Sequence, residues 1–342
     1  MRGSIRGSDL TDLQSNPLVG EQAAVQGAVG RVVPHEIIEA EAEQVAPISL
    51  SPGLLAWRKF RRHKLAMASA IFLIFMSLTA IFAHQIARYP YEATGVGPVF
   101  QGPTSAHWFG TDAIGRDLYS RVIYGGRISL AVGFAVAFVA TFIGTIVGAV
   151  AGYFGGKIDN FVMRVTDLFI ALPLLVILIL MRNLPERQPW ARQIMGDAGS
   201  MRATIVILSL FFWMPTARIV RGVVLSLKEK EFVEAARALG ASDKRIIFRH
   251  LLPNSAGPII VTVTLNVAAA ILTESALSFL GFGVNPPVPT WGNLLADSKG
   301  YFSIAPWLVW FPGVTVVLVV LAVNFMGDGL RDALDPRQQR VG

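Results

Sequence analysis

Residues 128–153 read ISLAVGFAVAFVATFIGTIVGAVAGY, a run with no charged side chain. An α-helix rises about 1.5 Å per residue, so a run of this length covers the hydrocarbon core of a bilayer, which is about 30 Å thick. The run therefore predicts a membrane-spanning helix, and this prediction decides the fold class.

The composition of the whole chain agrees with this interpretation. Of 342 residues, 53% are hydrophobic and 15% are charged, whereas about 25% are charged in an ordinary soluble domain. The absence of cysteine excludes structural disulfides and thiolate metal sites. Five further segments are long and apolar enough to cross a bilayer. The predicted fold class is an all-α integral membrane protein with six transmembrane helices, at about residues 65–86, 128–153, 161–182, 203–225, 255–281 and 304–326.

The segments outside the spans differ in character. Residues 1–53 are polar and include an acidic run, which predicts a disordered tail. Residues 54–64 combine apolar and basic side chains, which predicts an interfacial amphipathic helix; the alternative is a basic flank that only orients the next span. The transmembrane domain then covers residues 65–330, and residues 331–342 form a C-terminal tail.

The distribution of basic residues predicts the orientation in the membrane. If the N-terminus is cytosolic, the inner segments hold 17 Lys and Arg residues and the outer segments hold nine. Cytosolic loops of membrane proteins are enriched in these residues, so both termini are predicted to be cytosolic. The same rule accounts for the net charge of +7 without a nucleic-acid partner.

Small residues recur along the second span. Gly144, Gly148, Gly152 and Gly156 are spaced four residues apart, which builds a groove on one helix face where another helix can approach closely. The alternative is a glycine-lined wall of a translocation path, with Gly144 and Gly148 as the candidate path residues.

Few charged residues fall inside the predicted spans. Glu274 is the one acid well inside an apolar segment, which makes it a candidate for the translocation path. It also lies close to the end of its helix, so it could instead reach interfacial water or cap a partner. Arg164 and Asp167, in the third span, are three residues apart and are predicted to pair on one helix face.

Signatures of catalysis and nucleotide binding are missing from the sequence. The nearest approach to a phosphate-binding loop, at residues 151–158, lacks the first glycine and the final hydroxyl. No His-Glu-x-x-His pair or Gly-x-Ser-x-Gly elbow occurs. We therefore predict no catalytic residue, metal site or cofactor in this chain, and any ATP chemistry must come from another chain. A membrane-embedded enzyme is disfavoured, whereas a passive channel or scaffold would work without ATPase partners.

The polar loop at residues 226–254 is the most informative part of the chain. Its pattern predicts two short helices joined by a tight turn, with Gly240 ending the first helix and Ser242 capping the second. Pro253 is predicted to stop the second helix before the membrane. The two predicted apolar stripes consist of Phe232, Ala235, Ala236 and Leu239, and of Ile246, Ile247, Leu251 and Leu252. A rigid helical knob of this kind suits a groove on a partner protein.

This loop resembles the coupling loop in permease subunits of ATP-binding-cassette importers. Their pattern is Glu-Ala-Ala, three residues, Gly, nine residues, Ile-x-Leu-Pro, and His250 replaces the isoleucine here. The resemblance implies that the matching residues contact an ATPase subunit. These residues are Glu234, Ala235, Ala236, Gly240, Leu252 and Pro253.

Two further stretches narrow the resemblance to the oligopeptide, dipeptide and nickel permeases, and within them to the second permease. Residues 107–117 resemble that family's His-Pro-Leu-Gly-Thr-Asp-x-x-Gly-Arg-Asp, with Trp108 and Phe109 in place of Pro-Leu. Residues 277–292 are similar to its Leu-Ser-Phe-Leu-Gly-x-Gly…Pro-Pro…Ser-Trp-Gly. The similarity covers about residues 54–337.

The resemblance implies a role and a set of partners. The fold would be the transmembrane domain of a type I importer, multi-pass in a bacterial or archaeal cytoplasmic (inner) membrane. The partners would be a homologous second permease, two cytosolic ATPases that bind ATP and Mg²⁺, and an extracytoplasmic solute-binding protein. The expected substrates are peptides, and the alternatives are nickel, glutathione or an oligosaccharide.

The first of these stretches also has an interpretation of its own. Asp112 is predicted to cap a short helix that presents Arg116, Asp117, Arg121 and Arg127 on the outer surface. The resemblance makes this segment a candidate docking site for the binding protein; the alternative is a helix whose charges only keep it solvated. The candidate docking residues are Gly110, Thr111, Asp112, Gly115, Arg116 and Asp117.

Overall fold

The computed structural model describes residues 52–197 and 199–334, and these residues form helices joined by turns and loops. The predicted tail at residues 1–53 lies outside the described residues except for its last two, and residues 335–342 also lie outside them. The helices are α3 (Pro52–Arg62), α4 (Lys64–Ile81), α5 (Ala83–Ile86), α6 (Leu118–Phe154), α7 (Gly156–Ala171), α8 (Leu174–Arg182), α9 (Leu184–Arg187), α10 (Pro189–Met195), α11 (Met201–Leu227), α12 (Glu231–Ala238), α13 (Asp243–Ile246), the π-helix η1 (Ile247–Leu251), α14 (Leu252–Asn254), α15 (Ala256–Phe279), α16 (Trp291–Asp297) and α17 (Trp307–Leu334).

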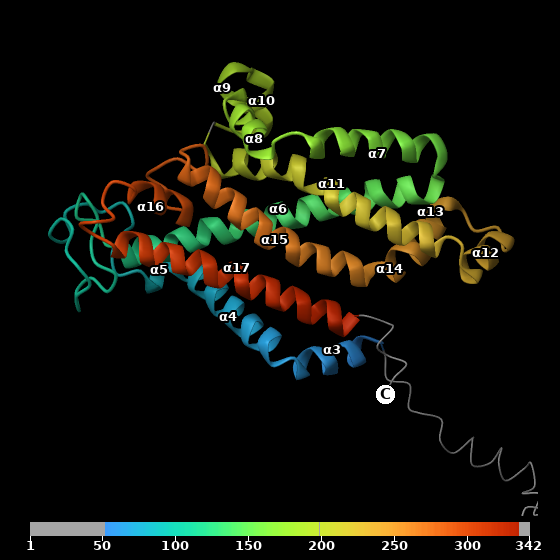
Figure 1. Ribbon diagram of the computed structural model, residues 1–342, viewed down its shortest axis with the longest axis horizontal. Helices are drawn as coiled ribbons and strands as arrows, with labels where there is room; N and C mark the ends of the chain where they lie inside the picture. The colour runs from blue at the N-terminus through green and yellow to red at the C-terminus, as the bar shows by residue number, and fades with distance from the viewer. Residues whose placement is uncertain (1–51, 198, 335–342) are drawn as a thin grey trace, which may run out of the picture. The chain divides into compact units, whose positions relative to one another are not determined.

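Five helices in the described part of the chain are long and apolar enough to cross a membrane: α4, α6, α11, α15 and α17. Helix α7 and the segment Leu174–Arg187, which comprises α8 and α9, pass the same test only together, and an 87° bend separates them. Figure 1 shows α12 and α13 at one end of this bundle and α16 at the other. The predicted all-α membrane fold agrees with this arrangement.

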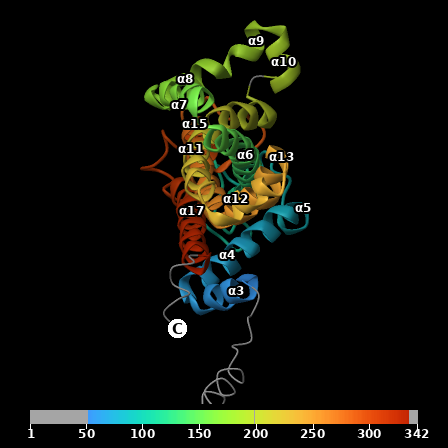
Figure 2. The ribbon, with the colours of Figure 1, turned by 90° about the vertical axis from the view of Figure 1, so that its right-hand side faces the viewer.

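The bend lies inside the third predicted span. The sequence predicts one helix over residues 161–182, whereas the structure ends α7 at Ala171 and begins α8 at Leu174. Pro173 has no N–H group and disfavours helical backbone at the residue before it, and Leu172 is accordingly extended, with φ −81° and ψ 144°. Helices α8, α9 and α10 lie to one side of the bundle in both views (Figures 1 and 2).

Helix α6 begins earlier than the sequence predicts. It starts at Leu118 rather than near residue 128, and its N-cap is Asp117, whose carboxylate accepts a hydrogen bond from the Ser120 N–H at 2.9 Å. The prediction that Asp112 caps a short surface helix is therefore wrong. Gly115 has a φ of +71°, so the chain turns there and the helix can begin only after it.

Close packing of α6 against α11 fixes the centre of the bundle. A Cβ atom at Gly144 would lie 2.5 Å from the Trp213 carbonyl oxygen, and one at Gly148 would lie 2.4 Å from the Ala217 carbonyl oxygen. Only glycine allows two backbones to approach this closely. The small-residue row therefore packs a helix, as predicted, although Gly156 lies beyond the end of α6 and has open space around it.

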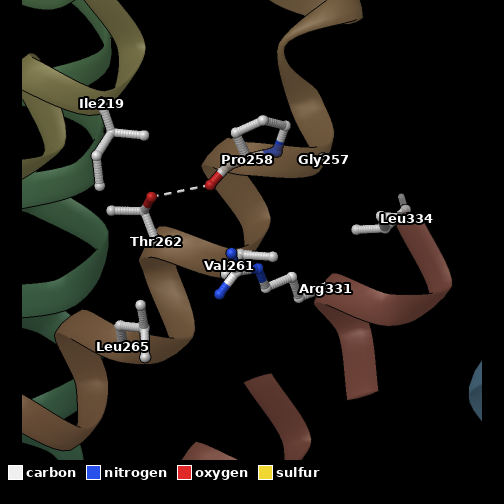
Figure 3. A pocket seen from close by; sticks show the side chains of 8 residues that line it. All are labelled: Ile219, Gly257, Pro258, Val261, Thr262, Leu265, Arg331 and Leu334. Carbon is white, nitrogen blue, oxygen red and sulfur yellow. Dashed lines mark hydrogen bonds between the residues drawn. The ribbon is translucent and has the colours of Figure 1, made fainter. Parts of the chain in front are cut away.

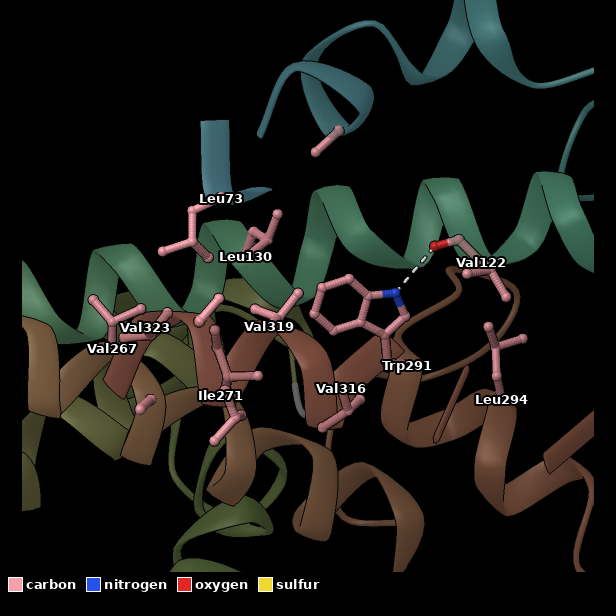
Figure 4. Packing of buried hydrophobic residues seen from close by; sticks show 14 of the residues in the cluster. Leu73, Val122, Leu130, Val267, Ile271, Trp291, Leu294, Val316, Val319 and Val323 are labelled. Atoms are coloured by element: carbon pink, nitrogen blue, oxygen red, sulfur yellow. Dashed lines mark hydrogen bonds between the residues drawn. The ribbon is translucent and has the colours of Figure 1, made fainter. Parts of the chain in front are cut away.

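A second core surrounds Trp291, the first residue of α16 (Figure 4). The indole is fully buried, and its Nε1–H donates to the Val122 carbonyl of α6 at 3.1 Å. Leu130 of α6, Ile271 of α15 and Val319 of α17 belong to the same apolar cluster. This cluster holds α16 against three spans.

Helix α3 packs against the end of α17 (Figure 2). Phe60 of α3 and Ala66 of α4 lie against Gly329, where a Cβ atom would come 2.3 Å from the Ala66 Cβ. Trp57 and three arginines of α3 are exposed whereas Phe60 is buried, so this helix is amphipathic; it ends at Arg62, two residues before the predicted end. Its position at a membrane surface remains a prediction.

Candidate functional site

The segment α12–α14 forms one end of the bundle, which we call the α12 end. Val233 and Ala236 of α12 are buried in an apolar cluster with Tyr153 of α6 and Val224 of α11. Phe232 is 39% exposed and Leu239 is 88% exposed. The predicted stripe of Phe232, Ala235, Ala236 and Leu239 is therefore wrong for all members but Ala236.

The turn between α12 and α13 follows the prediction at Gly240. Its φ is +76°, and the Ala241 N–H donates to the Ala236 carbonyl at 3.0 Å, which closes the end of α12. Ser242 stands at the N-cap of α13, but its side chain makes no capping bond. The side chains of Ile246 and Leu251 are fully buried, as the second predicted stripe requires.

Pro253 does not stop the helix as predicted. Helical backbone continues through η1 into α14, where Pro253 occupies the first turn and needs no N–H partner there. The break before the membrane span falls at Ser255, whose φ and ψ are −94° and 0°. The π-helical turn takes up the change in hydrogen bonding that the proline imposes.

Polar contacts tie this knob to the end of α6. The Tyr153 hydroxyl donates to the Asp243 carboxylate at 2.6 Å, and the Arg237 guanidinium lies 5.5 Å from the centre of the Tyr153 ring. The α12–α13 turn is thus bonded to a residue one position before the last of α6. The knob is therefore joined to that span by a side-chain hydrogen bond.

The exposed part of the α12 end is what a partner could contact. Glu234, Ala235, Gly240 and Pro253 are exposed and Leu252 is half-buried, whereas Ala236 faces inward. Phe248 of η1 is 60% exposed on the same segment, and no sequence pattern had pointed to it. We call Phe232, Glu234, Ala235, Leu239 and Phe248 the coupling surface.

At the opposite end, the segment 95–117 folds back on itself in front of α6. Gly110 and Gly115 have positive φ. A Cβ atom on Gly110 would lie 2.5 Å from the Gln101 carbonyl oxygen, and one on Gly115 would lie 2.5 Å from the Gly97 carbonyl oxygen. The Thr111 hydroxyl accepts a hydrogen bond from the Gln101 N–H at 2.9 Å. These glycines and Thr111 are buried, so their role within this chain is to close a turn.

The acidic and basic residues of this segment form a buried network instead of a charged surface. Asp112 accepts hydrogen bonds from Arg116 and, at 2.9 Å, from Arg121, which is 2% exposed. Arg121 also reaches Asp297 of α16 at 3.4 Å. Asp117 lies 2.9 Å from the Nδ1 atom of His107 through its other carboxylate oxygen. The prediction that these residues lie on the outer surface is therefore wrong for Asp117 and Arg121, whereas Arg116 is partly exposed and Arg127 is exposed.

Other residues are available for docking at this end. Trp108 is 51% exposed and lies under the guanidinium of Arg88, 4.9 Å from the ring centre. Ile114 is also half exposed. A protein that binds here would meet these side chains, and the candidate docking residues of the sequence would act by holding them in place.

Glu274 faces a closed interface. It belongs to α15, and its side chain is fully buried between that helix, α6 and the loop before α16. One carboxylate oxygen accepts from the Ser129 hydroxyl at 3.0 Å and the other accepts from the Ser278 hydroxyl at 2.7 Å. Gly144 and Gly148 are likewise occupied by the contact with α11.

A groove of about 410 Å³ lies along α15, between α11 and α17 (Figure 3). Its lining is apolar except for Thr262, whose hydroxyl donates to the Pro258 carbonyl at 2.8 Å, and Arg331 of α17. The groove can therefore hold a solute that combines an apolar part with an anionic group. Its lining residues are Ile219, Gly257, Pro258, Val261, Thr262, Leu265, Arg331 and Leu334.

Ion pairs join α7 to α11. Arg221 of α11 makes a two-bond contact with Asp159, and Arg218 bonds to Asp167. The predicted pair of Arg164 with Asp167 is wrong, because Asp167 is directed across to the neighbouring helix. Sequence spacing within one helix does not reveal such a pair.

Comparison with known families accounts for most of the chain. Residues 144–340 match the family described as binding-protein-dependent transport system inner membrane component. Residues 51–103 match the N-terminal transmembrane domain of oligopeptide transport permease C.

Individual relatives are similar over nearly their whole length. The chain is 41% identical over 291 residues to the dipeptide transport system permease protein DppC of Alkalihalophilus pseudofirmus, covering 85% of this chain and 92% of that protein. It is 39% identical to the oligopeptide transport system permease protein OppC of Bacillus subtilis, covering 88% and 94%. It is 41% identical to the glutathione transport system permease protein GsiD of Escherichia coli, covering 82% and 89%.

A solved structure shares the fold. An inward-facing structure of the MetNI methionine ABC transporter superposes with a TM-score of 0.53 at 22% identity, covering 63% of this chain and 96% of that one.

Proposed function

This chain belongs to the family of inner membrane components of binding-protein-dependent transport systems, in the branch of dipeptide, oligopeptide and glutathione permeases, and from that premise we propose that it takes up peptides. The peptides would be delivered by an extracytoplasmic solute-binding protein. A homologous second permease would complete the membrane channel, and both termini of this chain would be cytosolic.

The observation that carries the proposal is the coupling surface. Large apolar side chains such as Leu239 are exposed on a knob that is otherwise rigidly packed. Exposed apolar side chains on a rigid support mark a protein interface. We assign this surface to a cytosolic ATPase subunit, which would bind ATP and Mg²⁺ while this chain contributes no catalytic residue.

The attachment of the knob determines which helices would move with it. The contact of Asp243 with Tyr153 links the knob to α6, and the apolar cluster around Val224 links it to α11. When the two ATPases close on ATP, they would displace both knobs of the permease pair and rock the spans between inward-open and outward-open states.

The groove along α15 is the best candidate for the part of the path that opens near the α12 end. It replaces Gly144 and Gly148, which are occupied by helix packing. Arg331 gives the groove one positive charge, which suits the carboxylate that peptides and glutathione share. The second permease would close its open side.

The test is uptake by the reconstituted complex. The chain would be purified with a homologous second permease and two ATPase subunits, placed in proteoliposomes, and supplied with a binding protein and labelled peptides. Uptake that requires ATP on the ATPase side and the binding protein on the other side is expected. Uptake of nickel, glutathione or an oligosaccharide in preference to peptides would replace the substrate assignment, and uptake without ATP would contradict the coupling.

A further inference from the structure

The loop between α15 and α16, residues 280–290, and the first residue of α16 are linked to Glu274 of α15 through two serine hydroxyls. The Ser129 hydroxyl, which donates to Glu274 at 3.0 Å, accepts from the Trp291 N–H at 3.2 Å. The Ser278 hydroxyl, which donates to Glu274 at 2.7 Å, accepts from the Val284 N–H at 3.3 Å. Each serine hydroxyl therefore bridges the Glu274 carboxyl group and a backbone N–H group. These N–H groups belong to Val284 and Trp291, so most of the loop lies between them.

The chain also packs closely against α15 beside these relays. A Cβ atom at Gly283 would lie 1.9 Å from the Ser278 hydroxyl oxygen, and one at Gly292 would lie 2.5 Å from the Ser275 carbonyl oxygen. The loop backbone thus rests directly on the turn of α15 that follows Glu274. These contacts explain why glycine occupies both positions.

The carboxylate is well suited to this task. Both oxygens of the carboxyl group can accept hydrogen bonds, and a serine hydroxyl can donate to one of them while it accepts from a backbone amide. Burial strengthens these hydrogen bonds, because the surroundings have a low dielectric constant. Ser129 stands on α6, so the relay joins α6, α15 and α16.

We propose that Glu274 is a positioning residue that clamps the α15–α16 loop to α6, so that the loop, α16 and the adjoining half of α6 move as one piece during transport. It acts through Ser129 and Ser278 and does not touch the solute. The opposite end of α16 is held to α6 in the same way, through Asp297 and Arg121. The consequence for transport rests on the proposed function, whereas the clamp itself does not.

Hydrogen exchange at the amides of Val284 and Trp291, measured on the assembled complex in nanodiscs, tests the clamp. We expect Ser129→Ala to speed exchange about tenfold at Trp291 only, Ser278→Ala to do so at Val284 only, and Glu274→Gln to do so at both. The Ala241 N–H, which donates to the Ala236 carbonyl at 3.0 Å at the α12 end, serves as an internal reference that should not change.

Thr273→Val is the matched control on the same helix. Its hydroxyl bonds only to the Ala269 carbonyl of its own helix at 2.8 Å, so exchange in the loop should stay at the wild-type rate. Wild-type exchange at both amides in Glu274→Gln would overturn the proposal. The same exchange pattern in both serine variants would also overturn the proposal, because each serine is expected to protect a different amide.

A functional readout separates clamping from a general loss of structure. In Glu274→Gln, the ratio of ATPase activity with the binding protein to activity without it should fall severalfold, with the two serine variants in between. Reduced uptake with wild-type exchange would place Glu274 on the solute path and overturn the clamp. If the wild-type complex imports no peptide while the exchange pattern holds, the proposed function fails and the clamp stands.

Discussion

The charged side chain of Arg121 is buried at the end of the bundle that contains α16, where it bonds to Asp112 and Asp297. Removing one partner of a buried ion pair leaves the other charge unpaired. Asp112 keeps Arg116, so we expect Arg121→Met to lower the free energy of unfolding by about 2 kcal/mol. Thermal unfolding of the purified chain in detergent measures this. Arg127→Met, at an exposed position of the same helix, is the control, and equal shifts in the two variants would show that the network contributes nothing.

Leu239 tests the coupling surface at the level of a single side chain. It is 88% exposed, so Leu239→Asp should leave the stability of the chain within about 0.5 kcal/mol. It should weaken binding of the ATPase subunit by at least about tenfold, because apolar anchors dominate interface energies. Co-purification of the ATPase with each variant measures the effect. Ile114→Asp, at the opposite end, should retain the ATPase; loss of the ATPase in both variants would contradict the assignment.

Single residues were predictable where local backbone chemistry decides them. Gly240 was located correctly because a helix end with positive φ selects glycine. Asp112 and Asp117 were exchanged as caps, since both are acids followed by plausible helical sequence and only the turn at Gly115 distinguishes them. The inward direction of Arg121 depends on Asp297, far away in sequence, and no local pattern contains that information.

At the scale of helices, the contact between α6 and α11 predicts that a Gly→Ala substitution destabilises the chain at one glycine but not at another. A Cβ atom at Gly148 would meet the Ala217 carbonyl at 2.4 Å, whereas Gly222 of α11 has nothing within 4 Å. Gly148→Ala should therefore destabilise the chain by about 1–3 kcal/mol. Gly222→Ala should be neutral or stabilise it by up to about 1 kcal/mol through helix propensity. Thermal unfolding in detergent compares them, and a stable Gly148→Ala variant would show that the two helices do not pack as described.

The helices themselves were predictable to different degrees. Long apolar runs located α4, α6, α11, α15 and α17, because length and apolarity alone decide whether a helix can span a bilayer. The same criterion did not predict the break at Pro173, because length and apolarity do not include the backbone restriction that divides α7 from α8. The face of α12 was misassigned because Phe232 and Leu239 are apolar but directed away from this chain's own core.

At the scale of the whole transmembrane unit, the groove along α15 can be tested by filling it. Leu265 lines the groove, so Leu265→Trp should lower peptide uptake by about tenfold while the complex still assembles. Leu321→Trp places the same bulk in a different apolar groove, between α4 and α17, and is the control. Proteoliposome uptake measures both variants. Equal uptake by both would exclude the α15 groove from the path.

The length of α6 gives the molecule a mechanical property. Its 37 residues form a rod about 55 Å long, almost twice the thickness of the hydrocarbon core. One end is fixed at Asp117 and the other at Tyr153, which holds the knob. By simple leverage, a tilt of about 10° about one end of such a rod carries the other end through about 10 Å. If the proposed rocking occurs, a small angular displacement of α6 at one side of the bilayer would become a displacement about as wide as a helix at the other.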